Sequence, residues 1–120
     1  MPETTIFHNP RCSKSRQTLA AMEERGIAAT VIAYIESPPA EATLREVIAA
    51  LDVPATALIR TDDDAFVESG LDASAMDDDA VVEFLLAHPA TMQRPVVMHG
   101  ERARLGRPPE HALALFDDDS

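Results

Sequence analysis

The chain passes from strand to helix across His8-Asn9-Pro10-Arg11-Cys12-Ser13-Lys14-Ser15-Arg16. The preceding Thr4–Phe7 has the apolar, β-branched character of a strand. The helix is predicted from about Ser13 to Arg25, where Gly26 is a stop signal. This junction therefore places polar, chemically versatile side chains at the N-terminal end of a helix.

Cys12 is the one cysteine of the sequence, and it lies at this junction. The thiolate is the reactive form of cysteine, and a helix N-terminus with nearby cations lowers the thiol pKa below its free value of about 8.5. Arg11, Lys14 and Arg16 supply cations, and His8 can add another. These surroundings predict a reactive thiol. The alternative of a small, inert, buried cysteine remains open, because free cysteines are among the most buried residue types.

A single cysteine limits the chemistry that the chain can perform. It can form no intramolecular disulfide, so any redox cycle needs an external thiol, either glutathione or a partner protein. The four histidines have no ligand spacing with one another or with Cys12, and no metal site is expected. The acidic runs that begin at Asp62, Asp77 and Asp117 lack the spacing of a calcium loop. Helix caps and a solvated tail explain them better.

Length and composition predict one globular domain over residues 1–120, with 46% hydrophobic residues. No signal peptide or membrane-spanning run is apparent, so we expect a cytoplasmic protein without a membrane partner. The net charge of -11 argues against nucleic-acid binding. Arginines nevertheless gather in one late segment, as Arg94, Arg102, Arg104 and Arg107. Guanidinium groups match oxyanions, so they suggest an anion pocket, although ordinary solvated charges would look the same.

The remaining pattern alternates strands and helices. Ala29–Ile35 is a predicted strand, and Ser37-Pro38-Pro39 is expected to open a helix with proline in its first turn. Residues 54–88 look helical with short breaks, and a β-hairpin and a last helix from Pro108 follow. The predicted pieces are the buried helical stripe Leu44, Val47, Ile48 and Leu51, one helical turn at Ala57–Ile59, a short helix at Ala65–Gly70, a longer helix at Asp79–Ala87, and the hairpin strands Pro95–Met98 and Arg102–Leu105.

This order predicts an α/β fold with a mixed four-stranded sheet. The first strand, helix and second strand form a βαβ unit, which implies parallel pairing and a right-handed crossover. The hairpin then adds the other two strands. The helices of about residues 41–88 form an inserted cap.

Several fragments resemble the glutaredoxin-dependent arsenate reductases, a thioredoxin-like family related to the Spx regulators. The strand, His-Asn-Pro-x-Cys-Ser-x-Ser-Arg and helix order is the first. The others are Ala57-Leu58-Ile59-Arg60, His88-Pro89, Arg94-Pro95-Val96-Val97 and Gly106-Arg107-Pro108-Pro109. The resemblance covers nearly the whole chain and implies a thioredoxin-like fold.

The resemblance also implies roles for single residues. Cys12 matches the nucleophile that attacks arsenate, His8 a histidine that favours the thiolate, and Ser15 a hydroxyl that donates to it. Arg60, Arg94 and Arg107 match the arginines that bind the oxyanion, and Pro95 a structural proline that follows a cis peptide bond. This chain departs from its relatives at Thr61-Asp62-Asp63-Asp64, where carboxylates could pair with Arg60 instead of an anion.

The implied activity is reduction of arsenate, or a similar small oxyanion, to arsenite through a covalent thiol–arsenic intermediate. Glutathione is the implied co-substrate, glutaredoxin the partner, and no bound cofactor is expected. Two alternatives stay open. One is a thiol–disulfide or glutathione-linked oxidoreductase with another substrate. The other is a non-catalytic Spx-like regulator, disfavoured by the missing Cys-x-x-Cys switch and by the three arginines that are present.

Overall fold

The computed structural model describes residues 3–117 and confirms the predicted fold class. Four strands form one mixed sheet in the order β2-β1-β3-β4. β1 pairs in parallel with β2 and antiparallel with β3, which pairs antiparallel with β4. The strands are β1 (Thr4–His8), β2 (Thr30–Ala33), β3 (Val96–His99) and β4 (Arg102–Leu105).

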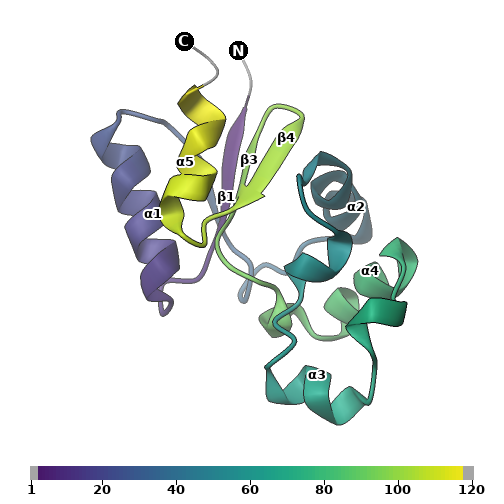
Figure 1. Cartoon of the computed structure of the whole chain (residues 1–120). Helices are drawn as coiled ribbons and strands as arrows, with labels where there is room; N and C mark the ends of the chain where they lie inside the picture. Colours follow the sequence, from purple (N-terminus) through teal and green to yellow (C-terminus); the bar gives the residue numbers. More distant parts are fainter. Residues whose placement is uncertain (1–2, 118–120) are drawn as a thin grey trace.

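Helices cover both faces of this sheet, and Figure 1 shows α1 and α5 on one side and the cap of α2, α3 and α4 on the other. Three short 3-10 helices complete the cap. The helices are α1 (Ser13–Glu24), α2 (Glu41–Ala50), η1 (Ala55–Leu58), α3 (Asp64–Ser69), η2 (Ala73–Ala75), α4 (Asp78–Ala87), η3 (Pro89–Thr91) and α5 (Pro109–Asp117). No helix within residues 3–117 has the length and apolar character needed to cross a bilayer.

Strand alternation divides the core into two clusters. Ile6 and Val97 are opposite one another in the sheet, and both are buried against Met22 and Leu115 under α1 and α5. Their neighbours Phe7 and Val96 project to the other face and join the larger cluster beneath the cap. Successive side chains of a strand point to opposite faces, so two adjacent residues can serve two cores.

The two helix starts that were predicted from prolines need correction. α2 begins at Glu41 with Ala40 as its N-cap, so Pro38 and Pro39 precede the helix and do not form its first turn. α5 begins at Pro109, one residue after the predicted start. The predicted capping role of the acidic runs is confirmed at two of them, since side chains of Asp63 and Asp77 accept backbone N–H groups of α3 and α4. Residues 118–120 of the expected solvated tail lie outside the described residues.

A short antiparallel bridge ties the cap to the segment before β3. Ile59 and Met92 are partners in an isolated bridge. Its hydrogen bonds run from the N–H of Arg60 to Thr91 O (2.8 Å) and from the N–H of Gln93 to Leu58 O (2.6 Å). Two segments that each carry a predicted site arginine are therefore fixed side by side.

Candidate active site

Cys12 is the N-cap residue of α1 and is partly exposed. Its backbone is extended (φ -95°, ψ 122°), and its N–H donates to Asn9 O at 3.0 Å, which closes the turn after β1. The side chain makes no capping hydrogen bond to the helix. The sulfur is thus presented beside the free N–H groups of the first helical turn, where the helix dipole favours negative charge.

Two of the predicted arginines approach this sulfur from distant parts of the chain. Arg107, between β4 and α5, has Nη1 3.8 Å from Cys12 Sγ, and the same nitrogen donates to Arg94 O at 3.1 Å. Arg94, just before β3, bears a buried Nε with no hydrogen-bond partner among residues 3–117. An unsatisfied buried donor is costly, and an anion seated beside the thiol would satisfy it.

Close packing holds the two arginine segments together. The Arg94–Pro95 peptide bond is cis, as the resemblance implied, and Arg107–Pro108 is a second cis bond that was not predicted. The N–H of Gly106 donates to Pro95 O at 2.9 Å. A Cβ atom at position 106 would lie only 2.6 Å from Pro95 Cγ and 2.6 Å from Thr18 Oγ1. Glycine is therefore required at position 106, because only it lets the backbone approach Pro95 and Thr18 this closely. This packing fixes the position of the backbone of the next residue, Arg107.

The environment lowers the pKa of the Cys12 thiol. Burial alone raises it, but several groups that stabilise the thiolate outweigh that effect: the backbone N–H of Ser15, hydrogen bonding from the Arg94 side chain, the backbone N–H of Lys14 and the positive charge of Arg94. The predicted activated thiol therefore has a physical basis in the helix end and in Arg94.

Alkylation kinetics would test this activation directly, because the chain has one cysteine. The rate of iodoacetamide modification, followed by mass spectrometry across pH, should have its midpoint below the value of a free thiol, about 8.5. Arg94→Ala should move that midpoint upward, because the thiolate loses a hydrogen bond and a compensating charge. Arg45→Ala, on the distant α2, is the matched control and should not. A wild-type midpoint at or above the free-thiol value would contradict the proposed activation.

His8 and Ser15 form a buried pair beneath the nucleophile, and their roles differ from those expected. His8 Nδ1 and Ser15 Oγ are 2.6 Å apart, and the N–H of Asn9 donates to the same Oγ at 3.0 Å. Burial, and secondarily the charge of Arg16, lower the pKa of His8, so the ring is mainly neutral at pH 7 and shares a hydrogen bond with the Ser15 hydroxyl. The lowered pKa disfavours a cationic His8 beside the thiolate.

The expected hydrogen bond from the Ser15 hydroxyl to the sulfur is also corrected. The hydroxyl is engaged with His8 and Asn9, whereas the backbone N–H of Ser15 is what stabilises the thiolate. The His8–Ser15 pair thus acts indirectly, by fixing the first turn of α1 against the turn after β1.

Arg60 is the predicted arginine whose side chain is held elsewhere. Its Nη1 lies 3.5 Å from Asp63 Oδ2, so the acidic run does capture it. Its backbone is still tied to the segment before Arg94 through Thr91. The structure thus joins Arg94 and Arg107 to Cys12, and brings the Arg60 backbone near them with its guanidinium paired to a carboxylate.

Tyr34 is a residue of this site that the sequence did not point out. It follows β2 and is fully buried, and its hydroxyl donates to Met92 O at 3.3 Å, two residues before Arg94. Burial raises the pKa of Tyr34. The charge and hydrogen bonding of Arg94 and a hydrogen bond from Asn9 oppose this shift, whereas the Cys12 charge adds to it. A tyrosine in a β-branched run is indistinguishable from an ordinary core residue, so no sequence signal could have found it.

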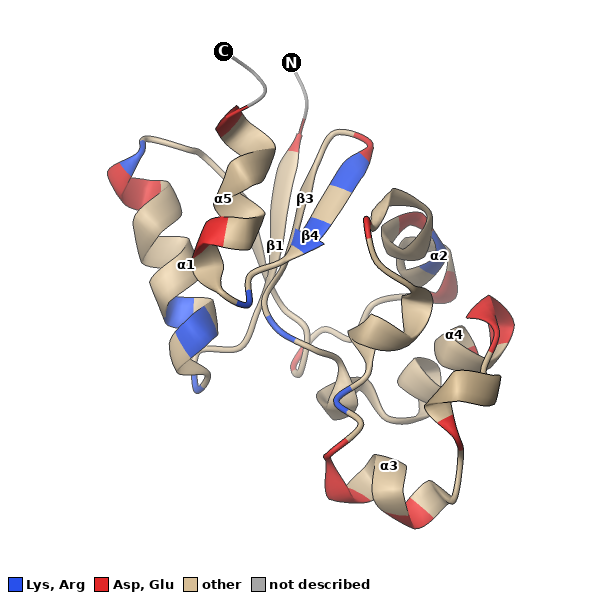
Figure 2. Cartoon of the chain, viewed as in Figure 1, with Lys and Arg blue, Asp and Glu red and all other residues tan. Residues whose placement is uncertain are grey.

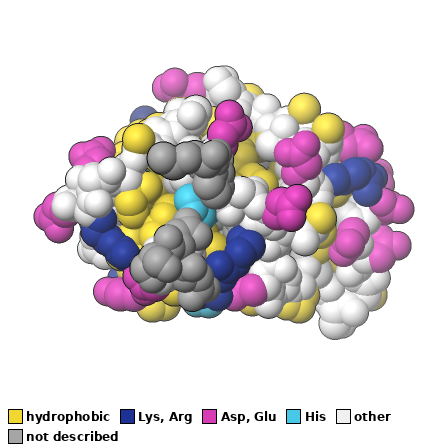
Figure 3. All heavy atoms as spheres, turned by 90° about the horizontal axis from the view of Figure 1, so that it is seen from above, with side chains coloured by type: hydrophobic (Ala, Val, Ile, Leu, Met, Phe, Trp, Pro, Cys, Tyr) yellow, Lys and Arg dark blue, Asp and Glu magenta, His cyan; other side chains and the backbone are white. Residues whose placement is uncertain are grey.

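Charge is distributed unevenly around the molecule. Figure 2 shows basic segments at the start of α1, on β4, before β3 and between β4 and α5, whereas acidic segments lie on the cap helices, on α5 and at the end of α1. Figure 3 looks onto the end of the molecule opposite the start of α1, where acidic and basic side chains are both scattered. The basic residues near Cys12 therefore stand out against a chain with a net charge of -11.

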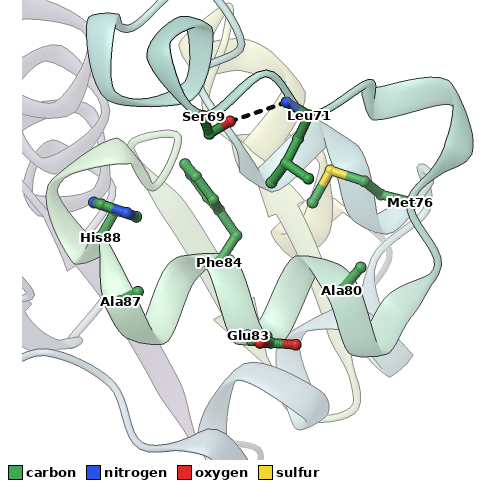
Figure 4. A pocket seen from close by; sticks show the side chains of 8 residues that line it. All are labelled: Ser69, Leu71, Met76, Ala80, Glu83, Phe84, Ala87 and His88. Carbon is green, nitrogen blue, oxygen red and sulfur yellow. Dashed lines mark hydrogen bonds between the residues drawn. The ribbon is translucent and has the colours of Figure 1, made fainter.

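The cap contains a separate cavity of about 350 Å³ that uses none of the predicted site residues. Figure 4 shows Leu71, Met76 and Phe84 projecting toward it, with His88 at its side. Within residues 3–117 no cluster of three or more His, Cys, Asp or Glu side chains is arranged to hold a metal ion.

Comparison with known proteins gives consistent matches. The model of the ArsC family matches residues 7–115. A protein of Neisseria meningitidis serogroup A named arsenate reductase is 44% identical over 117 residues, covering 97% of this chain and all of that protein. The Escherichia coli K12 protein YfgD, called uncharacterized, is 39% identical and covers 94% of this chain and 96% of its own length. The solved arsenate reductase from Vibrio cholerae has a TM-score of 0.87 and 38% identity, covering 94% of this chain and 97% of that one.

Proposed function

Because the chain belongs to the ArsC family and has its thioredoxin-like fold, we propose that it is an arsenate reductase that uses Cys12 as its nucleophile. One observation carries the proposal. Two guanidinium groups, from Arg94 and Arg107, converge on a thiol whose pKa is lowered. A thiolate is repelled by an oxyanion, so such an attack needs positive groups aimed at the charge that accumulates.

The proposed reaction begins when the Cys12 thiolate forms a bond to arsenic, while one hydroxyl of the protonated arsenate takes up a proton from solvent and leaves as water. Arg94 and Arg107 bind the remaining oxygens, and the N–H groups of the first turn of α1 add donors. The buried Nε of Arg94 gains a partner in this state. The two arginines therefore bind the anion and also stabilise the charge that develops on it.

A second thiol completes the cycle, and we propose glutathione for it. Its thiolate attacks the Cys12 sulfur, so that a sulfur–sulfur bond forms and the sulfur–arsenic bond breaks. The electron pair of the broken bond stays on arsenic, which leaves as arsenite. Glutaredoxin then exchanges with the mixed disulfide and returns Cys12 to the thiolate. Such a cycle needs a reducing compartment such as the cytoplasm.

A coupled assay tests this function. Protein, arsenate, glutathione, glutaredoxin, glutathione reductase and NADPH are combined, and NADPH oxidation is followed by absorbance. We expect the rate to fall to background when arsenate, glutathione or glutaredoxin is omitted. An equal rate of NADPH oxidation with and without arsenate would reject the proposal.

The lowered pKa and partial exposure of Cys12 also suit a second candidate, a glutathione-linked thiol–disulfide oxidoreductase. This protein would reduce glutathionylated substrates in the same coupled system without arsenate. The arginines distinguish the two candidates, because disulfide exchange does not require oxyanion ligands.

A further inference from the structure

A second cavity adjoins the turn that carries the nucleophile. It encloses about 190 Å³ and lies between the turn after β1 and the segment after β2. The same turn is closed by the hydrogen bond from the N–H of Cys12 to Asn9 O. The cavity and the thiol are therefore attached to one short piece of backbone. Its lining residues are His8, Asn9, Pro10, Arg11, Ala33, Ile35 and Glu36.

Two side chains of opposite charge, Arg11 and Glu36, line this cavity and do not stabilise the fold of the described chain through ion pairs. Neither the guanidinium of Arg11 nor the carboxylate of Glu36 forms an ion pair or a side-chain hydrogen bond with any residue of the described range 3–117. By contrast, Arg25, Arg45 and Arg60 each have a carboxylate partner. Ile35, which precedes Glu36 and is 49% exposed, adds apolar surface to the cavity lining.

Sheet topology separates this cavity from the oxyanion ligands. β1 lies between β2 and β3, so the cavity adjoins the turn after β1 from the β2 side. Arg94 belongs to the segment that enters β3, on the opposite side of β1. A ligand in the cavity and an anion beside the arginines can therefore be bound at the same time.

We propose that this cavity is the subsite for the second thiol, and that it takes a small thiol bearing both a carboxylate and an ammonium group. Arg11 binds the carboxylate and Glu36 the ammonium, with the thiol directed at the Cys12 sulfur. The inference rests on the proposed function, in which glutathione has this chemistry. It adds the place and the residues that select the co-substrate.

Disulfide exchange tests the subsite without arsenate. The Cys12 thiolate attacks a small disulfide, forms a mixed disulfide and releases one thiolate, which absorbance or mass spectrometry can follow. Three small probes of similar size differ in charge: dithiodiglycolate has only carboxylates, cystamine only ammonium groups, and hydroxyethyl disulfide neither. Glutathione disulfide, a larger tripeptide disulfide, has both groups. Dividing each rate by that of the neutral probe removes any change in Cys12 reactivity.

We expect Arg11→Ala to slow the two carboxylate probes about fivefold relative to the neutral probe, as for one exposed charge pair. Glu36→Gln should slow the two ammonium probes to a similar degree. Arg45→Ala and Glu46→Gln, both on α2, are the matched controls and should leave all ratios unchanged.

Ratios that are equal in wild type and both variants would overturn the subsite. If the exchange rates depend on probe charge as expected but the protein does not reduce arsenate, the proposed function is rejected and the subsite is supported. The two failures are therefore distinguishable.

Discussion

Replacing Cys12 with serine is expected to abolish arsenate-dependent turnover and leave the fold intact. A serine hydroxyl is a far weaker nucleophile than a thiolate, and it cannot form the disulfide that delivers electrons to arsenic. We expect a loss of at least about 10⁴-fold, to the rate of the assay without protein. NADPH oxidation in the coupled assay measures it.

The same substitution should not weaken the protein. Cys12 is the N-cap of α1 and makes no capping hydrogen bond, whereas serine is among the residues that cap helices best. The free energy of unfolding in urea should therefore stay constant or rise by up to about 1 kcal/mol. Activity would then be lost without any loss of stability, which separates loss of the nucleophile from loss of the fold. Residual arsenate-dependent turnover by the Cys12→Ser protein would show that the Cys12 thiol is not the nucleophile.

Arg94→Ala and Arg107→Ala should each reduce kcat/KM for arsenate by about 10²- to 10³-fold. Both side chains act where charge develops, and removing one preorganised donor at such a position has an effect of this size. Arg45→Ala is the control, because Arg45 lies on α2 and pairs with Glu41 and Asp79. Its effect should remain within about twofold, as expected for an exposed ion pair. Equal losses in all three variants would show that Arg94 and Arg107 are not the oxyanion ligands.

Binding measured without turnover sharpens this experiment. Calorimetry with arsenate and the Cys12→Ser protein reports anion affinity alone, and adding Arg94→Ala or Arg107→Ala to it should weaken that affinity. Arg60→Ala should weaken it less, because the Arg60 guanidinium is paired with Asp63. Asp63→Asn is the complementary variant, because it removes the carboxylate that pairs with the Arg60 guanidinium.

The elements were largely predictable because their signals are local. The strand patterns, the helix stop at Gly26 and the acidic caps depend on residues a few positions apart. Their bounds in the structure agree with the sequence within a few residues, apart from the later start of α2. The reactive setting of Cys12 was predictable for the same reason, since the helix end and the flanking cations are its sequence neighbours.

The roles within the site were less predictable. Sequence reasoning allowed His8 a cationic role and gave the Ser15 hydroxyl a bond to the sulfur. In the structure, burial lowers the pKa of His8, and the Ser15 hydroxyl is hydrogen-bonded to His8 instead. Tyr34 and Gly106 had no functional signal in the sequence, because their importance depends on what packs against them.

The sequence by itself determined a helix that begins at one activated cysteine within an α/β chain. Only the tertiary structure decided which arginines reach that cysteine. Arg94 and Arg107 lie more than 80 residues away from it, and their approach depends on strand order, on the close contact of Gly106 with Pro95, and on the bridge between Ile59 and Met92. Hydrogen bonding along a helix or turn is set by neighbouring residues, whereas contacts across the sheet arise only when the whole chain packs.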